Sequence, residues 1–145
     1  MNSVLYQFLN EPDRLKRKLH AIDMQIEDLM TQMLPGAIRY DKDSVMSSPE
    51  DKMIRYAERL EPLEKRRAVI QAQYDVAYEE VSGALDKLSP KQAAIMRMKY
   101  IDRKSNGDIA AGFKVSRRRI RQICEESYDV LLNIALTSTL KYDIV

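Results

Sequence analysis

The chain has 145 residues and a net charge of +2, and it contains one cysteine, four glycines and five prolines. This length suits one compact domain, or a small domain with a helical extension, and needs no metal or disulfide to form a core. A single cysteine, Cys124, excludes an internal disulfide and a cysteine-rich zinc site. Few helix breakers and much Ala, Leu, Met, Lys, Arg and Glu predict an all-α fold.

Several classes of protein are disfavoured by what the sequence lacks. The N-terminal residues have no signal-peptide pattern, and no run of about 18 apolar residues could cross a membrane, so we expect a cytoplasmic protein. His20 stands without a second ligand at metal-binding spacing, and no glycine-rich phosphate loop is present. We therefore expect no metal, no cofactor and no enzymatic activity, and we interpret Cys124 as a small buried apolar residue.

The first 88 residues predict a helical arm. A helix over about 11–34 would be capped by Asn10 or Glu11 with Pro12 in its first turn, and a loop would follow over 35–49. The first helix carries apolar residues at alternating spacings of four and three, typical of coiled-coil packing: Leu15, Leu19, Ile22, Ile26, Leu29 and Met33.

A second helix is expected over 50–88. Because Pro62 removes an intrahelical hydrogen bond, we expect a kink or a break in this helix near Leu60. If it is a break, Glu61 should be non-helical. The two long helices either fold back as an antiparallel hairpin or pair between chains. A helical arm beside a basic domain often supplies a dimer axis, so we expect a homodimer.

The C-terminal part, 89–138, predicts a helix-turn-helix, with a tail over 139–145. Ser89 and Pro90 open one helix, Asp102-Arg103-Lys104 make a turn, and Ser105 caps a short helix, "NGDIAAGF". Ser116 then caps a last helix from Arg117 to about Thr137. The expected core residues of this part are Ile109, Ala110, Phe113, Val115, Ile120 and Ile123, and the apolar stripe continues along the last helix through Ser127, Val130, Leu131 and Ile134.

Positive charge is concentrated in this part of the chain. Residues 85–124 contain eleven Lys and Arg against three Asp, a balance of +8, which leaves −6 for the rest of the chain. Such segregation is expected where one segment faces a polyanion.

The last helix begins with the densest run of arginines, "VSRRRIRQICEES". Recognition helices present their N-terminal residues to the major groove, where arginine pairs with guanine and glutamine with adenine. We expect Arg117, Arg118 and Arg121 to face outward with Gln122, and Arg119 to lie nearest the packed side. The predicted DNA-binding residues are Ser116, Arg117, Arg118, Arg119, Arg121 and Gln122, with weaker backbone contacts from Ser105, Lys104 and Lys114.

The motifs "LSPKQAAIMRMKY" and "SNGDIAAGFKVSRRRIRQICEESYDVL" resemble region 4 of the sigma-70 family, which reads the −35 promoter element. The resemblance implies base or near-base contacts from Arg117, Arg118, Arg121 and Gln122, and backbone contacts around Ser116 and Arg119. Primary sigma factors carry Glu at the position of Arg118, so the resemblance implies a different target sequence.

The layout of the chain also resembles the RinA/ArpU-type late transcriptional regulators of Gram-positive phages and prophages. That resemblance implies an activator of late phage genes in a bacterial host cell, acting on double-stranded DNA with RNA polymerase. Two alternatives are a DNA-packaging protein of the small-terminase type and a helical protein-interaction module whose basic face binds an acidic partner.

Overall fold

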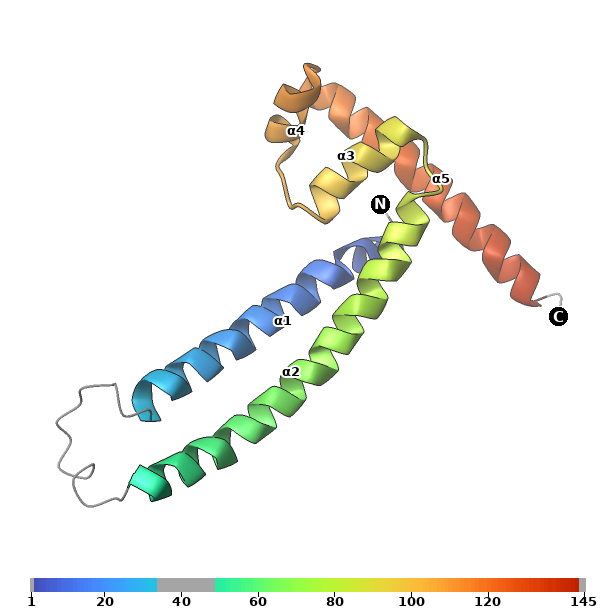
Figure 1. The fold of residues 1–145 in the computed structure, drawn as a ribbon. Coiled ribbons are helices and arrows are strands. Elements are labelled where there is room, and N and C mark those ends of the chain that lie inside the picture. Colours follow the sequence, from blue (N-terminus) through green and yellow to red (C-terminus); the bar gives the residue numbers. More distant parts are fainter. Residues whose placement is uncertain (1, 34–48, 144–145) are drawn as a thin grey trace. The chain divides into compact units, whose positions relative to one another are not determined.

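The computed structural model of the chain describes residues 2–33 and 49–143, with the side chains of 50–135 in the second range. Over these residues the protein is helical and has no strand (Figure 1). The helices are α1 (Ser3–Met33), α2 (Pro49–Leu85), α3 (Pro90–Tyr100), α4 (Asn106–Phe113) and α5 (Arg117–Asp143). The all-α prediction is confirmed. Most of the expected loop, 35–48, lies outside the described residues, and no described helix is long and apolar enough to cross a membrane.

The described residues divide into two compact units. The terminal unit contains Met1–Arg14 and Asp75–Val145, and the hairpin unit contains Leu15–Tyr74. The terminal unit thus groups the first turns of α1 and the last turns of α2 with α3, α4 and α5. The predicted domain division at residue 88 stays a prediction.

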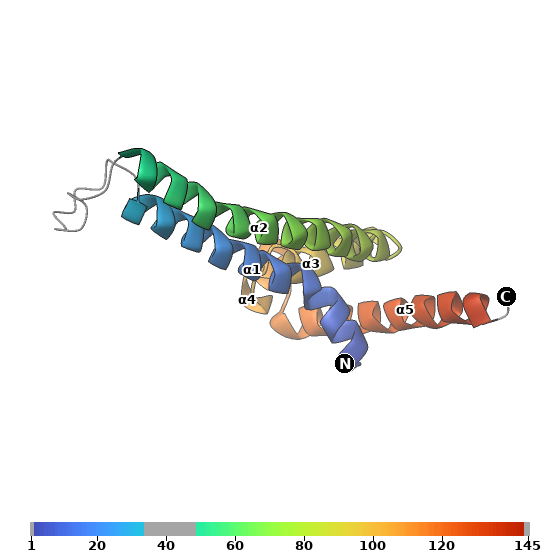
Figure 2. The same ribbon diagram turned by 90° about the horizontal axis from the view of Figure 1, so that it is seen from below.

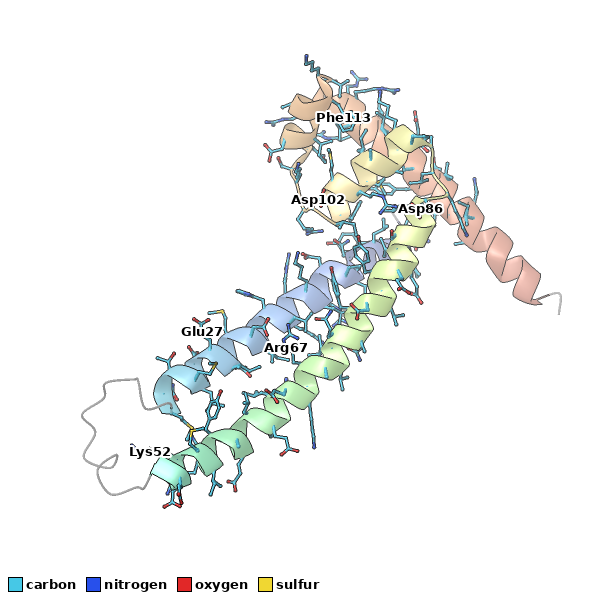
Figure 3. The ribbon with its side chains drawn as sticks, viewed as in Figure 1. Glu27, Lys52, Arg67, Asp86, Asp102 and Phe113 are labelled. Carbon is cyan, nitrogen blue, oxygen red and sulfur yellow. The ribbon has the colours of Figure 1, made fainter. Side chains whose placement is uncertain are left out.

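In the hairpin unit, α1 and α2 run antiparallel and side by side (Figures 1 and 2). The predicted apolar seam of α1 is buried at Leu15, Leu19, Ile22 and Leu29, while Ile26 and Met33 are half-buried. An ion pair joins the two helices, because Arg67 of α2, labelled in Figure 3, places its Nε 2.6 Å from Asp23 Oδ1 of α1. The long helices therefore pair within one chain.

Pro62 does not break α2. Glu61 is helical and its carboxylate lies 3.0 Å from Lys65 Nζ one turn later. Of the two outcomes predicted near Leu60, a kink or a break, the break is therefore wrong. Proline removes the bond to the carbonyl of Glu58, but Glu58 and Pro62 are both exposed, and water can reach that carbonyl.

The start of α1 also differs from our expectation. The helix begins at Ser3, and the preceding residue, Asn2, accepts a 2.8 Å hydrogen bond from the Val4 N–H through its Oδ1. Pro12 therefore lies inside the helix. Residues 3–10, which we had left outside the first helix, supply two core side chains, Leu5 and Leu9. Burial of these leucines accounts for the earlier start, since apolar burial outweighs the bond that Pro12 removes.

One apolar cluster forms the core of the terminal unit. Its buried members come from all five helices and from the turn after α2: Leu5, Leu9, Val81, Leu85, Leu88, Ile95, Met96, Tyr100, Ile109, Ala110, Ile120, Ile123, Cys124 and Leu131. The predicted core residues Phe113 and Val115 pack against it while partly buried. Ser127 is fully buried in the apolar stripe of α5. Its hydroxyl donates a 2.7 Å hydrogen bond to the Ile123 carbonyl, so this buried polar group has a hydrogen-bond partner.

Cys124 is buried in this core, as interpreted from the sequence, and burial raises the pKa of its thiol. Tyr100 and Tyr128 share a hydrogen bond between their hydroxyls and pack edge to face. Burial also raises the pKa of both phenols, so all three groups stay protonated at neutral pH. The exposed His20 lies in the hairpin unit.

We predict that Leu9→Ala lowers the free energy of unfolding of the terminal unit by about 2–5 kcal/mol, because it opens a cavity at a fully buried site. Val4→Ala, in the same helix but 72% exposed, should change it by less than about 0.5 kcal/mol. Urea unfolding followed by circular dichroism measures both. Equal stabilities of the two variants would contradict the packing of the N-terminal turns into this core.

Candidate nucleic-acid interface

Three helices of the terminal unit form the predicted helix-turn-helix, and α3, α4 and α5 all contact one another. Ser89 caps α3 in a reciprocal capping box, in which its hydroxyl accepts from the Gln92 N–H at 3.3 Å. Ser105 caps α4, where its hydroxyl accepts from the Asp108 N–H at 3.1 Å. Ser116 does the same for α5, with the Arg119 N–H as donor at 3.1 Å. The predicted starts of all three helices are confirmed.

The turn between α4 and α5 is a tight Schellman-type end. Lys114 has a left-handed backbone (φ 55°, ψ 44°), the Val115 N–H donates to the Ala110 carbonyl at 3.0 Å, and the Lys114 N–H donates to the Ala111 carbonyl at 3.3 Å. The side chain of Val115 is partly buried and packs against the core. This turn fixes where α5 begins relative to α4.

The rotation of α5 is fixed by its buried face. Ile120, Ile123, Cys124 and Ser127 are all at most 2% exposed. At about 100° per residue, Arg118 and Gln122 lie on the opposite side of the helix from Ile120. Both are exposed, as are Arg117, Arg119 and Arg121.

Three of the four arginines of α5 differ from the arginines elsewhere in the terminal unit, because they have no partner within the described part of the chain. Arg97 is bonded to Asp86, which lies just after α2 (Figure 3), and Arg103 donates to Asn10 Oδ1 at 2.8 Å and lies 3.6 Å from Asp13 Oδ1. Arg14 is bonded to Glu11. Among the residues that the structure describes, the guanidinium groups of Arg117, Arg118 and Arg121 have no hydrogen-bond or ion-pair partner.

Arg119 and Arg117 occupy places different from those we expected. The Arg119 guanidinium reaches Gln122 Oε1 at 3.5 Å along the exposed surface of α5, so it does not lie at the packed side. The Arg117 side chain is the one that lies against another helix, because its guanidinium covers Gly107 of α4. At about 60° from Ile120, Arg117 lies on the flank of α5 that faces α4, which explains the difference.

The weaker predicted contacts lie at the ends of α4. Lys104 and Ser105 precede its first turn and Lys114 follows its last, and all three are exposed. The hydroxyls of Ser105 and Ser116 already accept a backbone N–H, which leaves their O–H groups available as donors.

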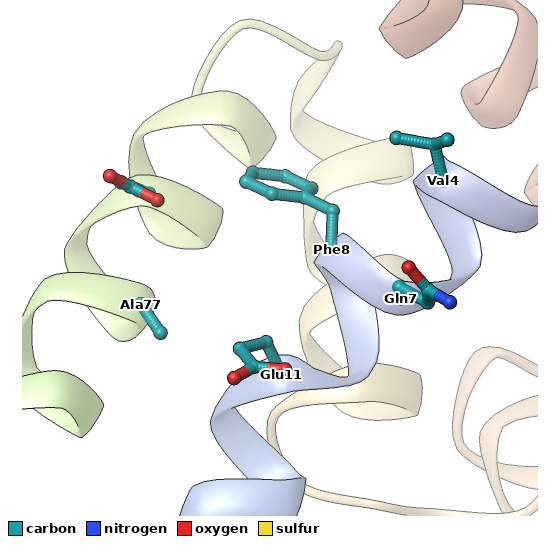
Figure 4. A pocket seen from close by; sticks show the side chains of 6 residues that line it. Val4, Gln7, Phe8, Glu11 and Ala77 are labelled. Atoms are coloured by element: carbon teal, nitrogen blue, oxygen red, sulfur yellow. The ribbon is translucent and has the colours of Figure 1, made fainter. Parts of the chain in front are cut away.

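A cavity of about 240 Å³ also lies in the terminal unit, between the first turns of α1 and the last turns of α2 (Figure 4). Apolar groups of Val4, Phe8 and Ala77 line it together with the polar side chains of Gln7, Glu11 and Glu80. This lining contains no nucleophile with an adjacent base. Over the described residues, no group of three or more His, Cys, Asp or Glu is placed to hold a metal ion.

Residues 84–130 match the family Sigma-70, region 4. This is a family of DNA-binding domains and not of enzymes. The curated proteins and the solved structures that were compared gave no match. The matched residues run from the last turns of α2 through α3 and α4 into the middle of α5, so the chain contains a sigma-70 region 4-like helix-turn-helix.

We predict that Lys114→Gly stabilises the protein but weakens its binding to duplex DNA. A non-glycine residue with a left-handed backbone costs roughly 1–2 kcal/mol, which glycine would recover, while the positive charge beside the recognition helix is lost. Thermal unfolding and fluorescence anisotropy with labelled duplex measure the two effects. Unchanged affinity in this variant would remove Lys114 from the interface.

Proposed function

We propose that the protein is a sequence-specific transcription regulator that binds double-stranded DNA through the first turns of α5. The observation that supports this most strongly is the set of partnerless guanidinium groups of Arg117, Arg118 and Arg121 at the start of the recognition helix. Unpaired arginines can bind phosphate or guanine without first breaking an internal ion pair.

The acidic residues of α5 agree with this orientation. Glu125, Glu126 and Asp129 are exposed and follow the arginines by one to three turns. They would repel phosphate if the middle of the helix lay in the groove. The N-terminal turns are therefore the part of α5 that enters, as in other helix-turn-helix proteins.

Within this interface, Arg118 and Gln122 are the proposed base-reading residues, because both point away from the buried face of α5. Arg121 is proposed to contact a base or a phosphate at the edge of the groove. Arg119, Ser116, Ser105, Lys104 and Lys114 are proposed to hold the DNA backbone. Primary sigma factors carry Glu at the position of Arg118, and a glutamate accepts a hydrogen bond from cytosine. We propose that Arg118 contacts guanine instead.

We predict that a selection from genomic duplex fragments recovers a defined operator whose affinity falls steeply with salt. On that operator, Arg118→Ala and Gln122→Ala should each cost about 1–3 kcal/mol of binding free energy and relax the preference at one base pair. Arg118→Glu should redirect that preference from guanine toward cytosine.

Arg66→Ala is the matched control, because it removes an exposed arginine from α2 in the hairpin unit. It should leave the affinity for the operator within about twofold of the wild type if the interface is confined to the terminal unit. An equal loss with Arg66→Ala and with Arg118→Ala would show that the binding is a general effect of charge.

The proposal extends to the biological role through the resemblance to RinA/ArpU-type regulators. In that role the protein activates late genes of a phage or prophage, with RNA polymerase, in the cytoplasm of a bacterial host. Transcription in vitro from the recovered operator, with and without the protein, distinguishes activation from repression.

We also propose that the protein is a homodimer. Large apolar side chains remain exposed on α2 of the hairpin unit, with Ile54 at 56% and Val69 at 59%. Both lie about 120–180° around the helix from the half-buried Leu60 and Leu63. Light scattering should give twice the mass of the chain, and the operator should contain two half-sites.

The same mass measurement addresses the alternatives. A ring-sized oligomer would favour a DNA-packaging role of the small-terminase type over regulation. In small terminases, however, the DNA-binding module normally precedes the oligomerising helices, and here the order is reversed. A protein without salt-sensitive affinity for any duplex would instead favour a protein-interaction module.

A further inference from the structure

Gly107, the second residue of α4, leaves room for the side chain of Arg117. A Cβ atom at this position would lie 3.0 Å from Arg117 Nη2, 3.1 Å from Nε and 3.3 Å from Cζ. Contacts this short are tighter than nearly all those that Cβ atoms make in proteins, so a larger residue at position 107 requires the Arg117 guanidinium to shift by a few tenths of an ångström. The φ angle of Gly107 is not positive, so the backbone conformation at this position does not require a glycine.

We propose that Gly107 is a positioning residue, which lets the Arg117 guanidinium lie against α4, and that Arg117 from there holds a DNA phosphate and reads no base. This inference rests on the proposed function, because it assigns a role within the same DNA interface. It departs from the base contact that the resemblance implies for Arg117.

The position of Arg117 on α5 supports the assignment. Arg118 and Gln122 leave the helix on the side opposite Ile120, whereas Arg117 leaves it about 60° from Ile120, toward α4. A guanidinium that lies on α4 is turned away from the outward face that presents base-reading groups. Its charge has no partner among the described residues, so it remains available to a ligand outside the protein.

The way in which helix-turn-helix proteins dock on DNA indicates which group the Arg117 guanidinium binds. The second helix of the motif enters the major groove, while the first crosses the DNA backbone. Here α4 is that first helix, so a guanidinium held on its first turn lies beside phosphate groups. Arginine binds phosphate through two parallel N–H donors, and such contacts set the register of the protein on the duplex.

The chain offers a matched control in the same helix. Gly112 also lies in α4 and has no positive φ, and a Cβ atom there would meet nothing within 4 Å. Alanine has the higher helix propensity, so Gly107→Ala and Gly112→Ala should both raise the melting temperature or leave it unchanged. At Gly107 the displaced atoms are the far end of a flexible side chain, so the fold should tolerate the change.

The test measures affinity for the selected operator over a series of salt concentrations. Arg117→Ala should weaken binding on the order of tenfold, by a similar factor for operator and unrelated duplex, and should reduce the slope of log affinity against log salt by about 0.9. Gly107→Ala should weaken binding to the operator and to unrelated duplex by the same factor. That factor should be no larger than the one for Arg117→Ala. Gly112→Ala should bind like the wild type.

The double variant Gly107→Ala with Arg117→Ala makes the coupling explicit. It should bind no more weakly than Arg117→Ala alone, because the glycine acts only through that arginine. Independent losses that multiply in the double variant would overturn the positioning role.

Two other results would overturn the inference while leaving the proposed function intact. The first is binding by Gly107→Ala that matches Gly112→Ala. The second is a loss in Arg117→Ala that is confined to the operator with an unchanged salt slope, which would make Arg117 a base-reading residue. A wild-type protein without salt-sensitive affinity for duplex DNA would overturn the proposed function and this inference together.

Discussion

The burial of one face of α5 determines what the rest of the interface can do. Ile120 is fully buried within the first turns of the helix, and Ile123 and Cys124 continue the same contact with the core. Once these side chains are fixed, the helix cannot rotate about its axis without exposing them, at a cost of roughly 1.5–3 kcal/mol for each large apolar side chain. Arg118 and Gln122 must therefore face outward, and Arg117 must lie toward α4.

The distribution of ion pairs separates structural arginines from those available to a ligand. Arg97 holds the end of α2 through Asp86 and Ser82, and Arg103 holds the turn before α4 to Asn10 and Asp13 of α1. These arginines contribute to the basic segment in the sequence, but their charges are partly compensated within the terminal unit. The net charge of residues 85–124 thus overstates the number of cations that can meet DNA.

Much of this arrangement could be predicted because it is encoded locally. Ser89, Ser105 and Ser116 are N-caps that act within three residues, and the apolar spacing of α5 fixed its buried face. The sequence predicts a start of α1 at about residue 11, because Pro12 suits the first turn of a helix. Leu5, Leu9 and Pro12 are nevertheless spaced by four and three residues, as on one face of a helix that begins earlier. The same local reasoning predicts a kink or a break near Leu60, but α2 has no break there, because solvent exposure makes the bond that Pro62 lacks tolerable. The predicted last helix ended near Thr137, with a tail from 139, whereas α5 continues to Asp143.

Contacts between distant residues had no such local signal. The bonds from Arg103 to Asn10 and the packing of Arg117 on Gly107 join residues from different helices, and no periodicity reports which side chains will meet. Nothing in the spacing distinguished Gly107 from Gly112, although only one of them lies under a guanidinium. The paired and unpaired arginines could therefore be separated only once the fold was known.

We propose that the start of α5, together with the ends of α4, forms the surface that meets duplex DNA. Backbone amide NMR of the full chain, titrated with the selected operator duplex, maps that surface residue by residue. We expect the largest shift changes on residues 104–107 and 114–122, while 50–74 of the hairpin unit and the acidic turns around Glu125 and Asp129 change little. Shift changes concentrated in the hairpin unit, or spread evenly over all exposed lysines and arginines, would contradict it.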